Sequence, residues 1–227
     1  WCQRHSGLTW MSWLVWIPAI LWTYKNIDIV QKALNRPSFE SQVQAWEKAI
    51  WKFSPALEWS QSWPWLVFSE ALHFCYCTYY LILPVLLVRL LRRERDDLAR
   101  ICLAGGISAL VCSYFGSIWF PVQGPRPLYP PLAAELQGPL WTFCHWLSRE
   151  GAAAAAAFPS GHVSLSSCVA IMAWRWDRKW MPLYLPWALG IAAATVYGRF
   201  HYTVDAAAGL MVAIFCAGVV LARDPDS

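Results

Sequence analysis

Long apolar segments constrain this chain more than any other feature. An α-helix needs about 20 residues to cross the hydrocarbon core of a bilayer, and it satisfies its backbone polar groups internally, as lipid requires. The sequence therefore predicts an all-α fold, a polytopic membrane helical bundle with six transmembrane helices plus interfacial helices. The chain reads as a single integral-membrane domain over residues 1–227. The expected spans are about 8–24, 64–88, 101–120, 159–176, 180–198 and 201–222.

Composition agrees with a membrane location. Hydrophobic residue types make up 58% of the chain and charged types 14%, whereas soluble domains carry about 25% charged residues. The chain has 17 tryptophans, a residue enriched at the membrane–water interface. Its net charge is +4, but the basic residues lie in short loops between apolar segments. We therefore expect membrane lipids as partners and no nucleic acid.

Two segments are expected to lie on the membrane surface. The first falls within residues 26–63, where apolar and charged side chains take opposite sides of a helix. Trp46, Ile50 and Trp51 lie on one side, and Glu47, Lys48 and Lys52 on the other. A second interfacial segment is expected near residues 141–146.

Arginine and lysine placement predicts the orientation, because short cytoplasmic loops are rich in these residues. The basic residues of the second-to-third and fourth-to-fifth loops are Arg89, Arg92, Arg93, Arg95, Arg100, Arg175, Arg178 and Lys179. With six spans, both loops and both chain termini face the cytoplasm. The opposite ends of the helices then face the periplasm, the exterior or a lumen.

The chain has eight cysteines and no C-x-x-C pair. Most lie inside apolar segments, where cysteine behaves as a small hydrophobic residue. The sequence therefore predicts neither a disulfide framework nor a zinc site.

Three polar clusters are expected at the extracytoplasmic ends of the spans. They are Gly124–Pro127, Pro159–His162 and Arg199–Asp205. Clusters that are distant in sequence and meet at one end of a helical bundle can assemble a site. The sequence therefore predicts an active site at the extracytoplasmic face.

His201 and Asp205 are four residues apart, so they share a face of a helix. A carboxylate that accepts the proton of one ring nitrogen leaves the other nitrogen with a free lone pair, and such an imidazole can attack phosphorus. The alternative is a buried His–Asp pair that only packs helices. We favour the catalytic interpretation, because ionisable residues inside spans are costly and usually functional.

Two arginines and one helix N-terminus supply candidate phosphate ligands. The guanidinium of Arg126 matches phosphate oxygens and stays charged, and Arg199 is a second candidate. The backbone N–H groups of Ser160, Gly161 and His162 are expected at a helix N-terminus, where they can face an anion. A protonated His162 can give a proton to a leaving oxygen as general acid.

Glu70 and His73 lie three residues apart near the outer end of the second span. They either line a headgroup pocket or pair with each other. Tyr76, Tyr79 and Tyr80 follow in the same span and are expected to serve packing.

The three clusters resemble the motifs of the type 2 phosphatidic acid phosphatase superfamily. Arg126-Pro127 resembles the end of its first motif, Pro159–His162 its second motif, and His201 with Asp205 the end of its third. The resemblance implies that His201 forms a phosphohistidine, Asp205 orients it, His162 is the general acid and Arg126 binds phosphate. It implies no metal and no organic cofactor.

Two departures from the superfamily pattern concern its cationic residues. Trp119 stands where a lysine is usual, and Ala194 and Thr195 stand where Ser-Arg is usual. The compact third motif resembles the branch near inositol phosphorylceramide synthase and sphingomyelin synthase, which transfer headgroups between lipids.

The resemblance leaves three functions open. We favour a metal-independent lipid phosphatase acting on a lipid phosphate or lipid pyrophosphate, because Arg199 would restore a second cation beside His201. The first alternative is a lipid phosphotransferase. The second is a catalytically inactive relative that binds or transports lipids.

Overall fold

The computed structural model describes residues 16–151 and 153–223. These residues form helices and loops without a β-strand, apart from one isolated bridge between Val122 and Ala156. The all-helical prediction is confirmed for this part of the chain. The elements are α3 (Trp16–Lys25), α4 (Ile27–Ala33), α5 (Glu40–Trp51), α6 (Pro55–Ser62), α7 (Leu66–Cys77), α8 (Tyr79–Leu91), α9 (Asp96–Trp119), η1 (Ala134–Leu136), α10 (Pro139–Gly151), α11 (Gly161–Trp176), η2 (Arg178–Trp180), α12 (Met181–Tyr197) and α13 (Thr203–Leu221).

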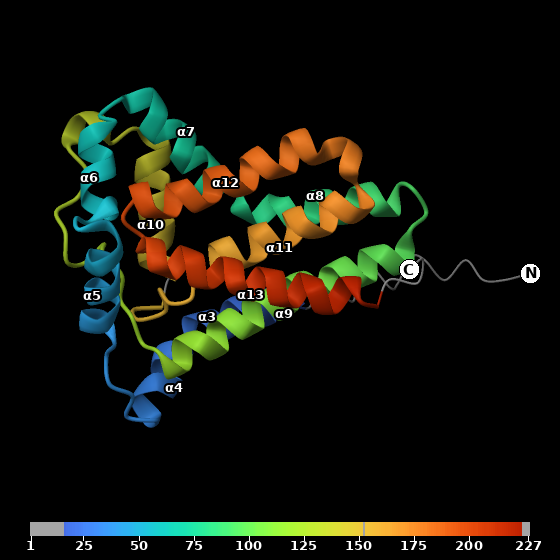
Figure 1. Cartoon of the computed structure of the whole chain (residues 1–227), viewed down its shortest axis with the longest axis horizontal. Helices are drawn as coiled ribbons and strands as arrows, with labels where there is room; N and C mark the ends of the chain where they lie inside the picture. Colours follow the sequence, from blue (N-terminus) through green and yellow to red (C-terminus); the bar gives the residue numbers. More distant parts are fainter. Residues whose placement is uncertain (1–15, 152, 224–227) are drawn as a thin grey trace, which may run out of the picture.

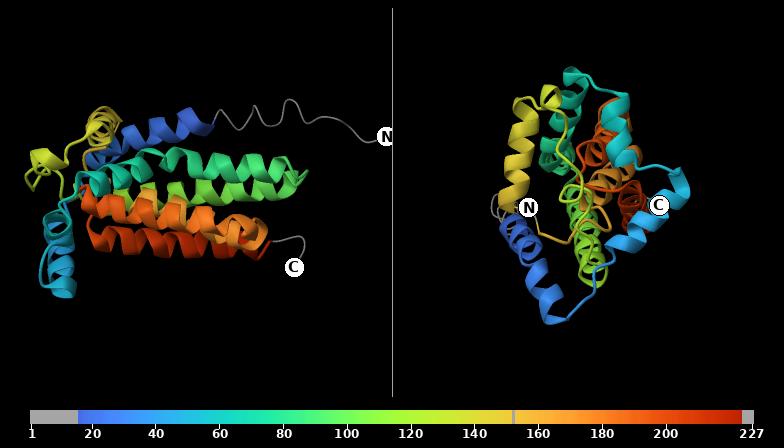
Figure 2. Two further views of the ribbon diagram at one scale, coloured as in Figure 1. Left: turned by 90° about the horizontal axis from the view of Figure 1, so that it is seen from above. Right: turned by 90° about the vertical axis from the view of Figure 1, so that its left-hand side faces the viewer.

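The long helices form a bundle with shorter helices across one end. Helices α8, α9, α11, α12 and α13 run along the long axis of the molecule, while α5, α6 and α10 lie crosswise at one end (Figure 1). The view from above shows the same division (Figure 2). Helix α11 is central, because it packs against α8, α9, α12 and α13. The crosswise helices mark the end of the bundle where the polar clusters lie.

Apolar side chains face both the inside and the outside of the bundle. Cys168, Val169 and Met172 of α11 are fully buried, whereas Phe115 of α9 and Phe215 of α13 are exposed. A helix that is apolar on all sides is typical of a membrane span. The exposed apolar side chains are therefore placed as lipid-facing residues would be.

The six expected spans are confirmed only in part. By length and composition, α9 and α13 can each cross a membrane, and α7 with α8 adds a third span if this pair, bent by 54°, counts as one. Helices α11 and α12 have 16 and 17 residues, fewer than the usual 20 or so. The first expected span extends beyond the described residues, which include only its end in α3.

A helix, α5, lies where the sequence predicts an interfacial segment, with Trp46, Ile50 and Trp51 exposed. The position of Glu47 was predicted incorrectly, because its side chain is buried rather than on a polar outer face. Its carboxylate accepts hydrogen bonds from the Thr203 hydroxyl and from the backbone N–H groups of Thr203 and Val204. A carboxylate at this position stabilises a helix N-terminus. Glu47 therefore fixes α5 against the N-terminus of α13.

The expectation of no disulfide is wrong for one pair of cysteines. Cys77, at the end of α7, is bonded to Cys144 in α10, with 6.1 Å between their Cα atoms. The two cysteines are 67 residues apart, and only the packing of α10 against α7 brings them together. Sequence spacing gives no signal for such a pair.

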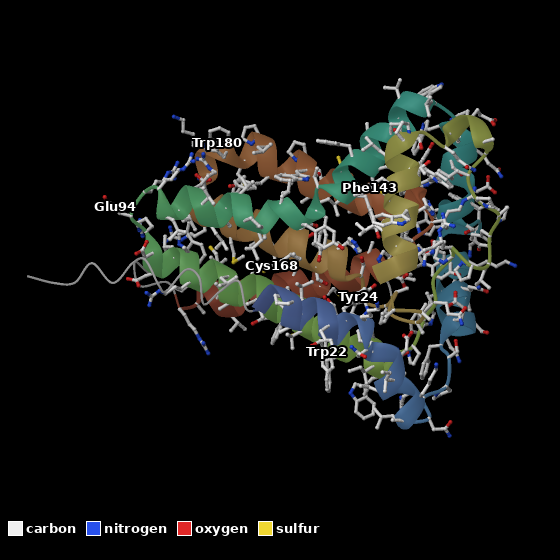
Figure 3. The ribbon with its side chains drawn as sticks, turned by 180° about the vertical axis from the view of Figure 1, so that it is seen from behind. Trp22, Tyr24, Glu94, Phe143, Cys168 and Trp180 are labelled. Carbon is white, nitrogen blue, oxygen red and sulfur yellow. A yellow bond between two sulfur atoms is a disulfide. The ribbon has the colours of Figure 1, made fainter. Side chains whose placement is uncertain are left out.

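The charged loops lie at the opposite end of the bundle from α10. Figure 3 shows Glu94 and Trp180 at one end and Phe143 of α10 at the other. At the Glu94 end, the buried carboxylate of Asp177 pairs with Arg89 at 2.6 Å and Arg93 at 2.9 Å. These ion pairs connect the end of α8 to the loop that precedes α12.

Candidate active site

The three polar clusters meet at the α10 end of the bundle through backbone contacts. The loop after α9 pairs with the segment before α11, because the N–H of Ala157 donates to the carbonyl of Val122 at 2.9 Å. The N–H of Ser160 donates to the carbonyl of Asp205 at 3.0 Å. These contacts fix the relative positions of the three segments.

Two glycines allow this close approach. Gly124 has a φ of 83°, which L side chains rarely adopt, and a Cβ there would lie 2.8 Å from the Phe200 carbonyl oxygen. A Cβ at Gly209 would lie 2.5 Å from the Ser160 carbonyl oxygen. Glycine at these positions lets the first loop reach the third cluster, and lets α13 reach the start of α11.

His201 is oriented mainly by a backbone carbonyl. Its Nδ1 lies 2.9 Å from the Ala157 carbonyl oxygen and 3.6 Å from Oδ2 of Asp205. Because a carbonyl only accepts, Nδ1 of the neutral ring carries the proton, and Nε2 has the lone pair. The sequence predicts Asp205 as the proton acceptor of this ring, but the Ala157 carbonyl is the closer partner.

Asp205 lies in the first turn of α13 and caps that helix, whereas His201 precedes α13, so the predicted shared helix face is wrong. Oδ2 of Asp205 accepts the N–H of Tyr202 at 2.8 Å, and the carboxylate remains within ion-pair distance of the imidazole. It is therefore placed to stabilise positive charge on His201, while the Ala157 carbonyl sets the ring orientation.

His162 faces His201 inside an aromatic enclosure. The two imidazole centroids are 5.7 Å apart in an edge-to-face arrangement. The ring of Tyr76 stacks on His162 at 4.6 Å, and that of Tyr79 lies at 4.4 Å. These tyrosines pack as the sequence predicts, and the ring that they pack against is the candidate catalytic His162. A phosphate ester held at the two rings would present its phosphorus to His201 and its leaving oxygen to His162.

The second cluster forms the N-terminus of α11. The Ser160 side chain caps this helix by accepting the N–H of Val163. The backbone N–H of Ser160 was expected to face an anion but donates to Asp205 instead. The N–H groups of Gly161 and His162 belong to the first turn, which has no partners within the helix, and both residues line the cavity described next.

A cavity of about 480 Å³ begins at His162 and His201 and continues between α8 and α9. Its far wall is apolar and includes Leu87 and Leu91 of α8 and Leu103 and Ile107 of α9. From Tyr79 to Leu91, α8 rises roughly 18 Å at about 1.5 Å per residue. One bilayer leaflet contributes about 15 Å of hydrocarbon, so the cavity wall is comparable in length to one leaflet.

Arg126 lies beside the cavity rather than in its lining. Its side chain is half-buried, and its charge acts on the hydroxyls of Tyr24 and Tyr76. Tyr24 lines the cavity, and Tyr76 stacks on His162. Arg126 is therefore a cation close to two tyrosines of this region, one of which stacks on His162.

The sequence was compared with models of known protein families. A family model described as the PAP2 superfamily matches residues 41–219. The chain belongs to the PAP2 superfamily. Searches of curated proteins and of solved structures found no match. The predicted resemblance to the type 2 phosphatidic acid phosphatases is confirmed, while the branch near inositol phosphorylceramide synthase stays a prediction.

Membership in the PAP2 superfamily supports a phosphatase-type or phosphotransferase-type function for this chain. The match includes all three polar clusters. Together with the apolar helices α9 and α13, it is consistent with a membrane protein.

Arg199 does not join the site in the way the sequence suggests. Its guanidinium donates to the carbonyls of Ala56 and Pro130 and to the Ser60 hydroxyl, and its backbone has a φ of 62°. These acceptors direct the side chain toward α6, and Arg199 is absent from the cavity lining. It therefore holds the loop between α12 and α13, and its contacts argue against a role as second phosphate ligand.

Glu70 and His73 have separate partners. The Glu70 carboxylate accepts the backbone N–H groups of Leu140 and Trp141 at 2.9 and 3.0 Å, which caps α10. His73 Nδ1 lies 2.7 Å from the Ser69 carbonyl oxygen. The structure gives each residue a backbone partner rather than pairing the two with each other.

Proposed function

We propose that this PAP2 superfamily member is a membrane lipid phosphatase that uses a phosphohistidine at His201. The observation that carries the proposal is the pair of imidazoles at the head of an apolar cavity, with Nε2 of His201 as the lone-pair nitrogen. The apolar wall of the cavity suits a lipid tail, and the polar end suits a phosphate.

The first half-reaction forms a bond between Nε2 of His201 and phosphorus and breaks the bond between phosphorus and the lipid oxygen. That oxygen leaves with a proton from His162. A bound phosphate favours the protonated form of His162, because opposite charges stabilise each other. Arg126 and the N–H groups of Gly161 and His162 offset the charge on the phosphate oxygens.

In the second half-reaction a water molecule attacks phosphorus and gives its proton to His162. The bond to Nε2 of His201 breaks, and free phosphate leaves. Asp205 stabilises the positive imidazole during this cycle, because its carboxylate lies 3.6 Å from Nδ1.

A second candidate function is transfer of the phosphorylated headgroup to a lipid hydroxyl. The contacts of Arg199 favour it, because they remove the second cation expected beside His201. A terminal phosphate monoester carries close to two negative charges and a diester only one, so a site with fewer cations suits a diester better. The two functions share the first half-reaction and differ in the acceptor.

Product analysis with purified protein tests this proposal. The protein is incubated with a lipid monophosphate, a lipid pyrophosphate or a lipid diester, with and without an alcohol acceptor and with excess chelator. We expect free phosphate from the monoester or pyrophosphate, and undiminished turnover in chelator, since the proposed ligands are all protein groups. A headgroup transferred from the diester, without phosphate release from the other two lipids, would establish the second candidate instead.

We also propose that the site faces the extracytoplasmic side. Two features at opposite ends of the bundle support this orientation. The arginine-rich loops lie at the Glu94 end, as expected for cytoplasmic loops. The Cys77–Cys144 disulfide lies at the α10 end, and disulfides form in oxidising compartments.

Cysteine labelling in intact cells tests the orientation. Glu135 and Asp97 are exposed at the two ends. With an impermeant thiol reagent we expect Glu135→Cys to be labelled from outside and Asp97→Cys to stay unlabelled until the cells are opened. The unsubstituted chain measures background from its own thiols. The reverse pattern would place the site in the cytoplasm.

A further inference from the structure

Three buried ring nitrogens lie together without a hydrogen-bond partner. They are Nε2 of His73 in α7, and Nε1 of Trp141 and Nε2 of His145 in α10. The ring centroids of Trp141 and His145 are 4.2 Å apart, and those of His73 and His145 are 6.0 Å apart. Buried polar atoms are almost always satisfied in folded proteins. A cluster of three such atoms therefore indicates a polar group that binds between α7 and α10.

The two helices that carry this trio are firmly connected. Glu70 of α7 accepts the N–H groups of the first turn of α10, and the Cys77–Cys144 disulfide joins the helices again. His73 is only 1% exposed. The three nitrogens are thus held in place before any ligand arrives, which lowers the cost of binding.

The trio offers donors and acceptors without charge. His73 donates from Nδ1 to the Ser69 carbonyl, so its Nε2 accepts. The indole N–H of Trp141 only donates. Burial lowers the pKa of His145 to about 3, and His73 and Arg126 act in the same direction, so this ring is neutral at physiological pH. A hydroxyl group, which both donates and accepts, fits this set, whereas a phosphate would find no cation in the trio.

The trio also lies close to the catalytic rings. The ring centroids of His145 and of Phe200, the residue before His201, are 5.0 Å apart. Tyr76 stacks on Phe200 at 4.2 Å and on His162 at 4.6 Å. Arg126 acts electrostatically on both Tyr76 and His145. Phe200 and Tyr76 thus connect the trio to His162, and Arg126 acts on a ring at each end of this connection.

We propose that His73, Trp141 and His145 form a subsite for the hydroxyl groups of an uncharged alcohol. This inference rests on the proposed function, because the alcohol is either the headgroup of a donor lipid or a free acceptor. It assigns the enzyme a second recognition element besides the phosphate ligands, one that selects among lipids of equal charge.

Binding to the inactive His201→Ala protein tests the headgroup source. Phosphatidylglycerol and phosphatidylmethanol are diesters of the same charge, and only the first has headgroup hydroxyls. In competition with a fluorescent lipid, we expect about fivefold tighter binding of phosphatidylglycerol, as one net hydrogen bond would give. Adding His145→Phe, which keeps the stacked ring but removes both nitrogens, should bring the ratio close to one. Adding His145→Gln should restore part of it, and Phe143→Leu, on the exposed side of α10, should leave it unchanged.

Product analysis with the active protein tests the acceptor source. Glycerol is added to turnover of phosphatidic acid, and glycerol phosphate is measured beside free phosphate. A glycerol phosphate yield that falls several-fold in His145→Phe, relative to free phosphate, supports an acceptor subsite. The inference is overturned if neither the lipid preference nor the glycerol phosphate yield depends on His145, because the trio then holds only water. Absence of turnover by the unsubstituted protein would contradict the proposed function, while the binding measurement still decides the subsite.

Discussion

Replacing His201 with alanine should abolish turnover of every lipid phosphate. We expect a loss of about 10³-fold or more, the scale seen when a covalent nucleophile is removed. The geometric reason is that Nδ1 is committed to the Ala157 carbonyl, so Nε2 is the nitrogen that can attack phosphorus. Initial rates of phosphate release by purified protein measure the effect.

His201→Asn is the matched control for this substitution. Its side-chain amide can still donate to the Ala157 carbonyl, so folding is preserved while the nucleophile is lost. Both variants should melt near the temperature of the unsubstituted protein, with His201→Asn closer to it. Near-normal turnover in either well-folded variant would remove His201 from the mechanism.

His162→Ala should lower the turnover rate less on substrates with good leaving groups, because such groups need little protonation.

The second large effect is expected at Arg126. Arg126→Ala should lower kcat/KM by about 10² to 10³-fold, as removal of one donor to a developing charge does. Arg126→Lys should recover part of this loss, because lysine keeps the charge without the planar fork. Gln123→Ala is the control, since this exposed side chain lies in the same loop. Steady-state kinetics on a lipid monoester give the comparison.

Replacement of Arg199 should affect the stability of the protein, whereas replacement of Arg126 affects turnover. The buried guanidinium of Arg199 satisfies three acceptors, so Arg199→Ala should lower the melting temperature, with a loss of about 2 to 4 kcal/mol of stability. Arg126→Ala should leave the melting temperature nearly unchanged. A folded Arg199→Ala protein with lost monoester turnover and unchanged stability would restore Arg199 as a phosphate ligand.

The sequence was sufficient to predict an all-helical fold and to select His162, His201 and Asp205, which lie close together in the structure. His162, His201 and Asp205 could be proposed because their chemistry depends on side-chain type and because they stand at the ends of apolar segments. Arg126 could be proposed because prolines flank it in the loop that follows α9. The number of spans was less accessible, because α11 and α12 are shorter than the apolar segments that contain them.

Other features depend on backbone atoms and tertiary contacts, which leave no residue signature. The Ala157 carbonyl orients His201, although any residue could supply it. The buried Glu47 has the same local sequence context as a solvated interfacial glutamate, and only the position of α13 distinguishes the two. The Arg199 side chain leaves a backbone in the left-handed conformation. The sequence does not indicate this conformation, because the residue is not a glycine.

The most direct test of the account is to trap the covalent intermediate. Purified protein is mixed briefly with a lipid phosphate labelled in its phosphate group, quenched in alkali, where phosphohistidine survives, and digested for mass spectrometry. We expect phosphate on the peptide containing His201, attached to Nε2, and none in His201→Asn. Phosphate on His162, or a full turnover with no phosphate bound to the protein at any time, would contradict this expectation.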